Sequence, residues 1–164
     1  MVVSIDTVDD DLLLEVLNST PVLDGVRHEL LADADEHLRE VRDRLQAVVR
    51  GDEPAGVLTP YLDGVHLVPE IGGAGLTWRL GDDSTAARVL VAWGQVQESM
   101  PGRLRACAND ECRLFLIDRS RPGTARWCSM KTCGNRLKAR RNYERRNYER
   151  RVSSTQSSMR SHHS

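Results

Sequence analysis

The four cysteines of this chain form two matched pairs in the last third of the sequence. Four residues separate the members of each pair and fifteen separate the pairs; the cysteines are Cys107, Cys112, Cys128 and Cys133. Thiolates are preferred soft ligands of zinc, and a structural zinc site takes four ligands in a tetrahedron. The spacing therefore predicts one structural zinc ion per chain. Four protein ligands leave no open position for water or substrate, so we do not expect the metal to be catalytic.

Disulfide bonds and buried free thiols are the two alternatives for these cysteines. Disulfides require an oxidising compartment, but residues 1–6 contain neither a basic flank nor an apolar run of signal-peptide length. Free buried cysteines seldom occur as two matched pairs. The sequence also lacks an apolar stretch close to the roughly twenty residues that span a bilayer. We therefore expect a cytoplasmic protein that has no membrane partner.

The residues between the cysteine pairs predict the elements that position them. Residues 113–118 are β-prone, residues 119–123 have turn composition, and residues 124–127 lead back toward the second pair. This pattern predicts a hairpin between the pairs. Helix-favouring residues follow from about Met130. Knuckle, hairpin and helix, in that order, are typical of a treble-clef zinc finger.

The start of this helix suits a thiolate site. Its exposed N–H groups and positive dipole end would stabilise the thiolates of Cys128 and Cys133, and Gly134 would let the backbone approach a sulfur. So short a module buries little apolar surface, so zinc binding should supply part of its folding free energy. We expect replacement of a ligand cysteine to unfold the finger and to leave residues 1–100 largely helical.

Residues around the second cysteine pair resemble a known family, the CGNR zinc finger. The matching segments are Trp127-Cys128-Ser129-Met130, Cys133-Gly134-Asn135-Arg136 and Lys138-Ala139-Arg140-Arg141. Upstream, the family's Phe-x-x-Asp-x-Ser-Arg run is matched by Phe115, Asp118, Ser120 and Arg121. The resemblance covers roughly residues 103 to 145. In that family the finger usually follows an α/β domain called ABATE, which is described as a stress-induced transcription regulator.

The start of such a partner domain is also present. Residues 14–20, Leu-Glu-Val-Leu-Asn-Ser-Thr, resemble the Leu-Asp-Phe-Val-Asn-Thr signature of ABATE, with Glu15 in place of its Asp and Ser19 before Thr20. The resemblance implies an ABATE-like α/β domain over residues 1–100 and a CGNR finger with a basic helix over residues 103–151. The low-complexity, serine-rich residues 152–164 should be disordered.

Charge divides the chain into two unlike halves. Residues 1–102 contain 19 acidic and 7 basic residues, whereas residues 103–164 contain 5 acidic and 16 basic ones. A basic end on an acidic body predicts a polyanionic partner, because phosphate neutralisation releases counterions. Electrostatic attraction between the two halves is the alternative. The residues expected to contact DNA are Asn135, Arg136, Lys138, Arg140, Arg141 and Arg145.

The N-terminal hundred residues predict helices and a small antiparallel sheet, which is an α+β fold. Three aspartates precede a helix over residues 12–17, and apolar residues at three- and four-residue intervals predict a long helix from Leu30 to Gly51. Residues 65–71 and 76–80 predict a hairpin with a four-residue glycine-rich turn. A further helix is expected over residues 86–97, and Pro101-Gly102 is the expected hinge into the finger.

Two classes of function remain open from the sequence. In the first, the protein is a DNA-binding transcription regulator, and its N-terminal domain senses a signal or forms a homodimer. In the second, the finger docks on a protein such as the transcription machinery, and the N-terminal domain has an unassigned activity. A treble clef is compatible with both. The sequence contains no nucleophile–base motif and no second set of metal ligands, so we do not expect an enzyme.

Overall fold

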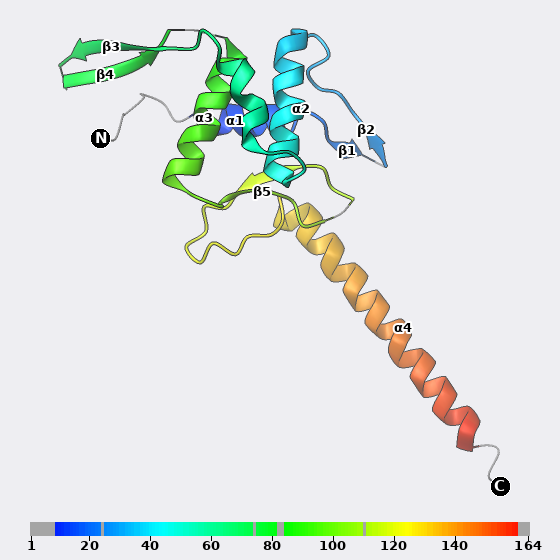
Figure 1. The fold of residues 1–164 in the computed structure, drawn as a ribbon. Helices are drawn as coiled ribbons and strands as arrows, with labels where there is room; N and C mark the ends of the chain where they lie inside the picture. Colours follow the sequence, from blue (N-terminus) through cyan, green and yellow to red (C-terminus); the bar gives the residue numbers. More distant parts are fainter. Residues whose placement is uncertain (1–8, 24, 74, 82–83, 110, 161–164) are drawn as a thin grey trace. The chain divides into compact units, whose positions relative to one another are not determined.

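A computed structural model describes residues 9–160, apart from residues 24, 74, 82–83 and 110. The chain divides into two compact units, residues 1–128 and residues 129–164. In the first unit, helices α1 (Asp10–Leu17), α2 (Glu36–Arg50) and α3 (Thr85–Ser99) pack together with the 3₁₀ helix η1 (Ala55–Leu62), as Figure 1 shows.

In the described part of the chain, three separate two-stranded antiparallel sheets accompany these helices. They are β1 (Val22–Leu23) with β2 (Val26–Arg27), β3 (Leu67–Gly72) with β4 (Gly75–Leu80), and β5 (Leu104–Ala106) with β6 (Phe115–Ile117). The predicted α+β class is confirmed, but the expected single sheet is replaced by three ribbons. Gly72 pairs with Gly75, so the strand pairing includes the first and last residues of the expected four-residue turn.

Capping residues decide where the helices begin and end. The predicted start of the second helix near Leu30 is wrong, because α2 begins only after Asp35, whose carboxylate accepts the Leu38 N–H at 2.6 Å. The predicted end is right: Gly51 has a φ of 82°, the left-handed conformation that favours glycine. Helix α3 starts after Ser84, whose hydroxyl accepts the Ala87 N–H at 3.2 Å.

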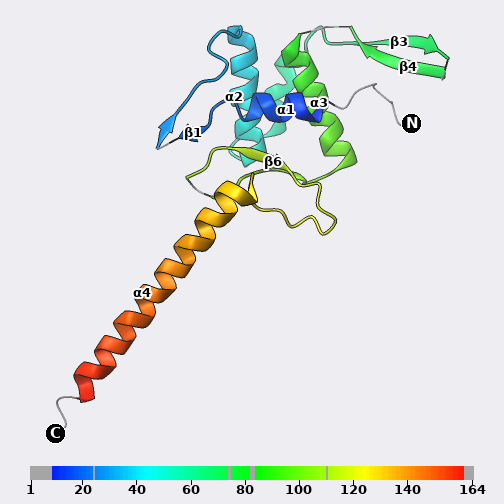
Figure 2. The same ribbon diagram turned by 180° about the vertical axis from the view of Figure 1, so that it is seen from behind.

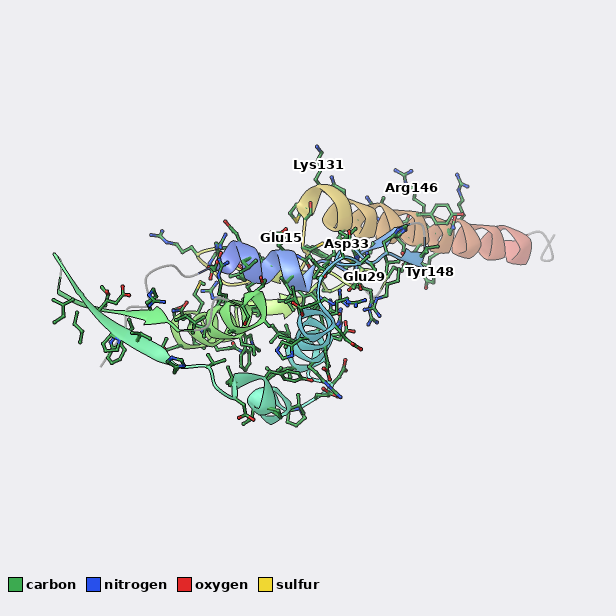
Figure 3. All side chains as sticks on the ribbon, turned by 90° about the horizontal axis from the view of Figure 1, so that it is seen from above. Glu15, Glu29, Asp33, Lys131, Arg146 and Tyr148 are labelled. Atoms are coloured by element: carbon green, nitrogen blue, oxygen red, sulfur yellow. The ribbon has the colours of Figure 1, made fainter. Side chains whose placement is uncertain are left out.

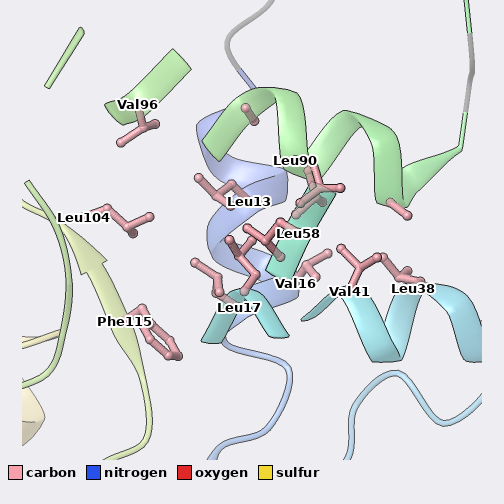
Figure 4. Close-up of a cluster of buried hydrophobic side chains, with 14 of the residues drawn as sticks. Leu13, Val16, Leu17, Leu38, Val41, Leu58, Leu90, Val96, Leu104 and Phe115 are labelled. Carbon is pink, nitrogen blue, oxygen red and sulfur yellow. The ribbon is translucent and has the colours of Figure 1, made fainter. Parts of the chain in front are cut away.

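The hydrophobic core joins the helices to the cysteine-bearing segment. Figure 4 shows Leu13 and Leu17 of α1 beside Leu58 and Leu90 in a buried cluster. The same cluster contains Leu104 of β5 and Phe115 and Ile117 of β6. Figure 2 shows β6 lying beneath α1. The strands of the expected finger are therefore part of the core of the N-terminal unit.

This packing changes two sequence-based expectations. The boundary between compact units falls after Cys128 rather than at Pro101-Gly102, because β5 and β6 bury their apolar residues against α1 and α2. The predicted hairpin partner of residues 113–118 is also wrong. Strand β6 pairs with β5, upstream of the first cysteine pair, and not with residues 124–127. A hairpin thus encloses the first cysteine pair instead of lying between the two pairs.

The second unit consists of a π-helical turn and a long α-helix. The turn η2 spans Met130–Gly134, and α4 spans Asn135–Arg160. The helix continues nine residues past the predicted limit at residue 151, because no glycine or proline interrupts residues 135–160. Residues 161–164 of the predicted disordered tail lie outside the described residues. In the described part of the chain, no helix is long and apolar enough to cross a membrane.

Candidate metal centre

The structure brings all four predicted ligands together. The Sγ atoms of Cys107, Cys112, Cys128 and Cys133 all lie within 4.8 Å of one another. Those of Cys112 and Cys128 are 3.7 Å apart, far longer than the roughly 2.05 Å of a disulfide bond. That separation is also close to the roughly 3.8 Å edge of a tetrahedron with metal–sulfur bonds of about 2.3 Å. Four thiols in this arrangement fit a tetrahedral metal ion.

The first cysteine pair lies in the loop of the β5–β6 hairpin. The Cys107 N–H donates to the Leu114 carbonyl at 2.8 Å, and the Cys112 N–H donates to the Asn109 carbonyl at 2.8 Å. These bonds close a compact knuckle. Asn109 is 4% exposed, and its Oδ1 accepts the Glu111 N–H at 3.3 Å. Asn109 is absent from the sequence-based predictions, although an asparagine two residues after a cysteine is a signal for a turn.

The third ligand is held by backbone contacts with the same knuckle. The Cys128 N–H donates to the Cys107 Sγ at 3.5 Å, and the Ala108 N–H donates to the Arg126 carbonyl at 2.8 Å. Cys107 is 8% exposed, so its side chain is largely shielded from water. The same knuckle therefore positions the first and third candidate ligands next to each other.

Asp118 organises the loop that leads from β6 toward Cys128. Its side chain is fully buried; Oδ1 accepts the Ser120 N–H at 2.9 Å and the Ser120 hydroxyl at 2.5 Å, and Oδ2 accepts the Ala125 N–H at 2.9 Å. The Ser120 hydroxyl and these backbone donors hold the pKa of the Asp118 carboxyl below its usual range. Arg103 and Arg105 lie 3.8 and 3.4 Å from Oδ2. Asp118 and Ser120 thus have a structural role in this loop.

Two residues at the C-terminal ends of α1 and α2 anchor β6 within the N-terminal unit. Asn18, which caps the C-terminus of α1, accepts the Phe115 N–H at 2.7 Å and donates to the Phe115 carbonyl at 3.2 Å. Arg50 of α2 donates to the Arg113 carbonyl at 2.7 Å, and its guanidinium lies 4.4 Å from the centre of the Phe115 ring. Burial, followed by the charge of Arg113, lowers the Arg50 pKa. Asn18 lies in the segment that resembles ABATE, but the sequence predicts an anchoring role for neither residue.

Cys133, the fourth ligand, lies in the π-helical turn before α4. The Gly134 N–H donates to the Ser129 carbonyl at 3.0 Å, a five-residue span that gives the turn its π geometry. The sequence predicts that Gly134 brings the backbone close to a ligand sulfur. The three nearest neighbours of a Cβ placed there are instead atoms of Met130, the closest being its Sδ at 2.9 Å. Because Gly134 has no Cβ, it leaves room for the thioether of Met130.

The residues expected to contact DNA lie along α4 and face several directions. Arg140 pairs with Glu144 at 3.1 Å, Arg145 lies 3.9 Å from Glu149, and Asn135 donates to the Lys131 carbonyl at 3.4 Å. Lys138 and Arg141 are exposed as well. The Arg136 side chain lies outside the described part of the structure. Figure 3 shows the side chains of Lys131, Arg146 and Tyr148 extending away from their own helical segment.

The fold and the cysteine cluster together define a metal-binding finger whose first strands belong to a helical body. Comparison with known families supports this classification: residues 103–146 match the CGNR zinc finger. No curated protein matches the chain. The matched segment contains the four cysteines, the Asp118 loop and the first half of α4.

Proposed function

We propose that Cys107, Cys112, Cys128 and Cys133 bind one structural zinc ion, and that the protein is a DNA-binding transcription regulator. The observation that supports this best is the four-thiolate cluster followed directly by a helix with nine basic and two acidic residues. A metal held by four thiolates stabilises the fold and leaves no vacant position for chemistry. The bound zinc would fix a treble-clef-like arrangement of knuckle and helix.

The length and charge of α4 suit a duplex surface. Its 26 residues correspond to about 39 Å at about 1.5 Å per residue. Lys138, Arg141 and Arg145 follow at spacings of three and four, so they share one face of the helix. Arg140 lies on another face, where it pairs with Glu144. We assign phosphate contact to the face that contains Lys138, Arg141 and Arg145.

The acidic N-terminal unit would act as a sensing or dimerising domain of a stress-response regulator, as the ABATE resemblance implies. Its net charge over residues 1–102 is −12, so nucleic acid would repel it. Nucleic acid would then bind only at the basic C-terminal segment, residues 103–164. We propose no enzymatic activity for this unit.

Docking on a protein is the second candidate function of the finger. Tyr143 and Tyr148 are 67% and 71% exposed, and exposed tyrosines are enriched where proteins meet. Under this proposal the tyrosines, rather than the basic side chains, would dominate binding. Replacement of both tyrosines by alanine separates the two candidates.

The test is DNA binding by the zinc-loaded protein, measured by fluorescence anisotropy over a series of salt concentrations. Replacing Lys138, Arg141 and Arg145 together by alanine should flatten the plot of log affinity against log salt by about 0.9 for each phosphate that the variant no longer neutralises. The matched control removes three charges from the opposite face, at Arg140, Arg146 and Arg150, and should weaken binding less. Elemental analysis should find one zinc per chain.

Two outcomes would contradict the regulator proposal. The first is no affinity of the zinc-loaded protein for duplex DNA at low salt. The second is an equal loss of affinity in both triple variants, because that would indicate nonspecific charge attraction rather than a defined binding face. Loss of binding only in the Tyr143 and Tyr148 variant, measured with a protein partner, would favour the docking function.

A further inference from the structure

The β3–β4 ribbon has one wholly apolar face and one polar face. Cross-strand partners lie on the same side of an antiparallel ribbon, and successive partners alternate sides. One face therefore contains three apolar pairs, namely Leu67 with Leu80, Pro69 with Trp78, and Ile71 with Leu76. The other face contains Val68 with Arg79, Glu70 with Thr77, and Gly72 with Gly75. We call the first set the apolar ribbon face.

The outer end of the apolar ribbon face is open to solvent. Ile71 is 89% exposed and Leu76 is 57% exposed. Figure 1 shows the ribbon extending away from helices α1, α2 and α3 of the same unit. A two-stranded ribbon is marginally stable in water unless an apolar face packs against something. Within the described residues, Leu67, Trp78 and Leu80 are half-buried, whereas the outer end of this face lacks a cover.

The charge distribution of the chain favours a second copy of the chain as the partner that buries the apolar ribbon face. Residues 67–80 contain one acidic and one basic residue, Glu70 and Arg79, which pair at 2.7 Å on the polar face. The ribbon is thus neutral, whereas residues 1–102 have a net charge of −12. Two acidic bodies repel each other least where they meet through a neutral surface that projects from both. A face without charges is also complementary to itself, as a two-fold interface requires.

We propose that two copies of this chain associate through their apolar ribbon faces, with Ile71, Leu76 and Trp78 at the contact. Six residues of strand span about 20 Å and two strands about 10 Å, so the face covers on the order of 200 Å². A standard interface buries about 800 Å² on each partner. The resulting dimer is therefore weak and reversible. This proposal deepens the dimerising role in the proposed function, on which it rests, by naming its surface.

The test is sedimentation velocity of the zinc-loaded full chain without DNA, at concentrations from about 5 µM to about 1 mM. The wild type should shift from monomer toward dimer across this range. Introducing Ile71→Glu and Leu76→Glu together should weaken association by about tenfold or more, because each carboxylate would be desolvated at the contact. The control, Val68→Glu, adds one carboxylate to the polar face opposite Arg79 and should weaken association far less.

Circular dichroism of each variant must match the wild type, so that a folding defect is not mistaken for weakened association. Replacing Ile71 alone by Thr, which retains β propensity, provides a second and milder variant that should give an intermediate shift. A monomer at every concentration would overturn the proposal, as would a dimer that the Ile71 and Leu76 changes leave intact. A monomer whose ribbon binds another protein instead would also overturn it. DNA is absent from the test, so failure of the DNA-binding proposal would not affect the result.

Discussion

At the scale of single residues, the buried Asp118 carboxylate determines the conformation of the loop before the third ligand. Two N–H groups and one hydroxyl converge on it, and Arg105 supplies positive charge 3.4 Å away. An amide in place of the carboxylate would direct an NH₂ group at one of these donors. The loop, rather than the metal ligands themselves, would then lose its support.

We predict that Asp118→Asn lowers the thermal midpoint at pH 7 and increases the rate at which a chelator removes the metal. The folded-state pKa of Asp118 lies below its unfolded value. The carboxylate therefore stabilises the fold above the unfolded pKa of about 3.9, and this contribution is lost as pH falls through the lower folded value. The difference between wild type and variant should stay constant from pH 7 to about pH 5 and shrink only below about pH 4. A difference that disappears at about pH 6 would contradict this account.

At the scale of elements, the contact between the end of α1 and strand β6 links two segments that are distant in sequence. Asn18 and Phe115 are 97 residues apart, and the Asn18 amide satisfies both the N–H and the carbonyl of Phe115. Leu104 of β5 and Ile117 of β6, which face each other in the register, pack in the same core as α1. The strands that flank the Cys107–Cys112 knuckle, β5 and β6, are therefore anchored to the helical core.

We predict that Asn18→Ala destabilises the N-terminal unit by about 1–3 kcal/mol, because two partly buried backbone groups lose their partner. Chemical denaturation followed by circular dichroism would measure the change. Asn18→Asp is the matched variant: it retains the acceptor for the Phe115 N–H, but its second carboxylate oxygen would face the Phe115 carbonyl oxygen, so it should destabilise the unit as well. Equal stability of wild type and Asn18→Ala would show that β6 needs no anchor on α1.

At the scale of the whole molecule, the body and the metal knuckle should fold together. The cysteine spacing alone led us to expect that a ligand replacement unfolds only the finger. The structure instead places Leu104, Phe115 and Ile117 in the core with Leu13 and Leu17. A metal bound at the first cysteine pair would restrain the loop at the end of this hairpin. Loss of the metal should therefore weaken the helical body as well.

We predict that chelation, or Cys112→Ser, lowers the unfolding midpoint of the helical signal by about 10 °C, because the β5 and β6 side chains lose part of their packing. Differential scanning calorimetry, together with circular dichroism, would measure this change in the midpoint. Ala108→Ser, at an exposed position in the same knuckle, is the matched control and should have little effect. Adding a chelator to the Cys112→Ser variant should not lower its unfolding midpoint further. An unchanged helical midpoint after metal removal would restore the view of two independent domains.

The sequence by itself determined the features that depend on local spacing. The cysteine pairs identified the four thiols that the structure brings together, because a metal site requires particular donor atoms whatever the surrounding fold. Apolar periodicity identified α3 closely, and Gly51 marked the end of α2, because helix formation and left-handed caps depend on neighbouring residues. Composition also identified the basic segment that became α4.

Only the tertiary structure decided the partner of β6 and the boundary of the N-terminal unit. Strand β6 is three residues long, and a short β-prone run does not specify which distant strand it pairs with. Pairing with β5 became favourable because Phe115 can then reach the core beside α1, an effect that no local pattern encodes. For the same reason the roles of Asn18, Arg50 and Asn109 could not be predicted: each depends on a backbone group or ring supplied by folding.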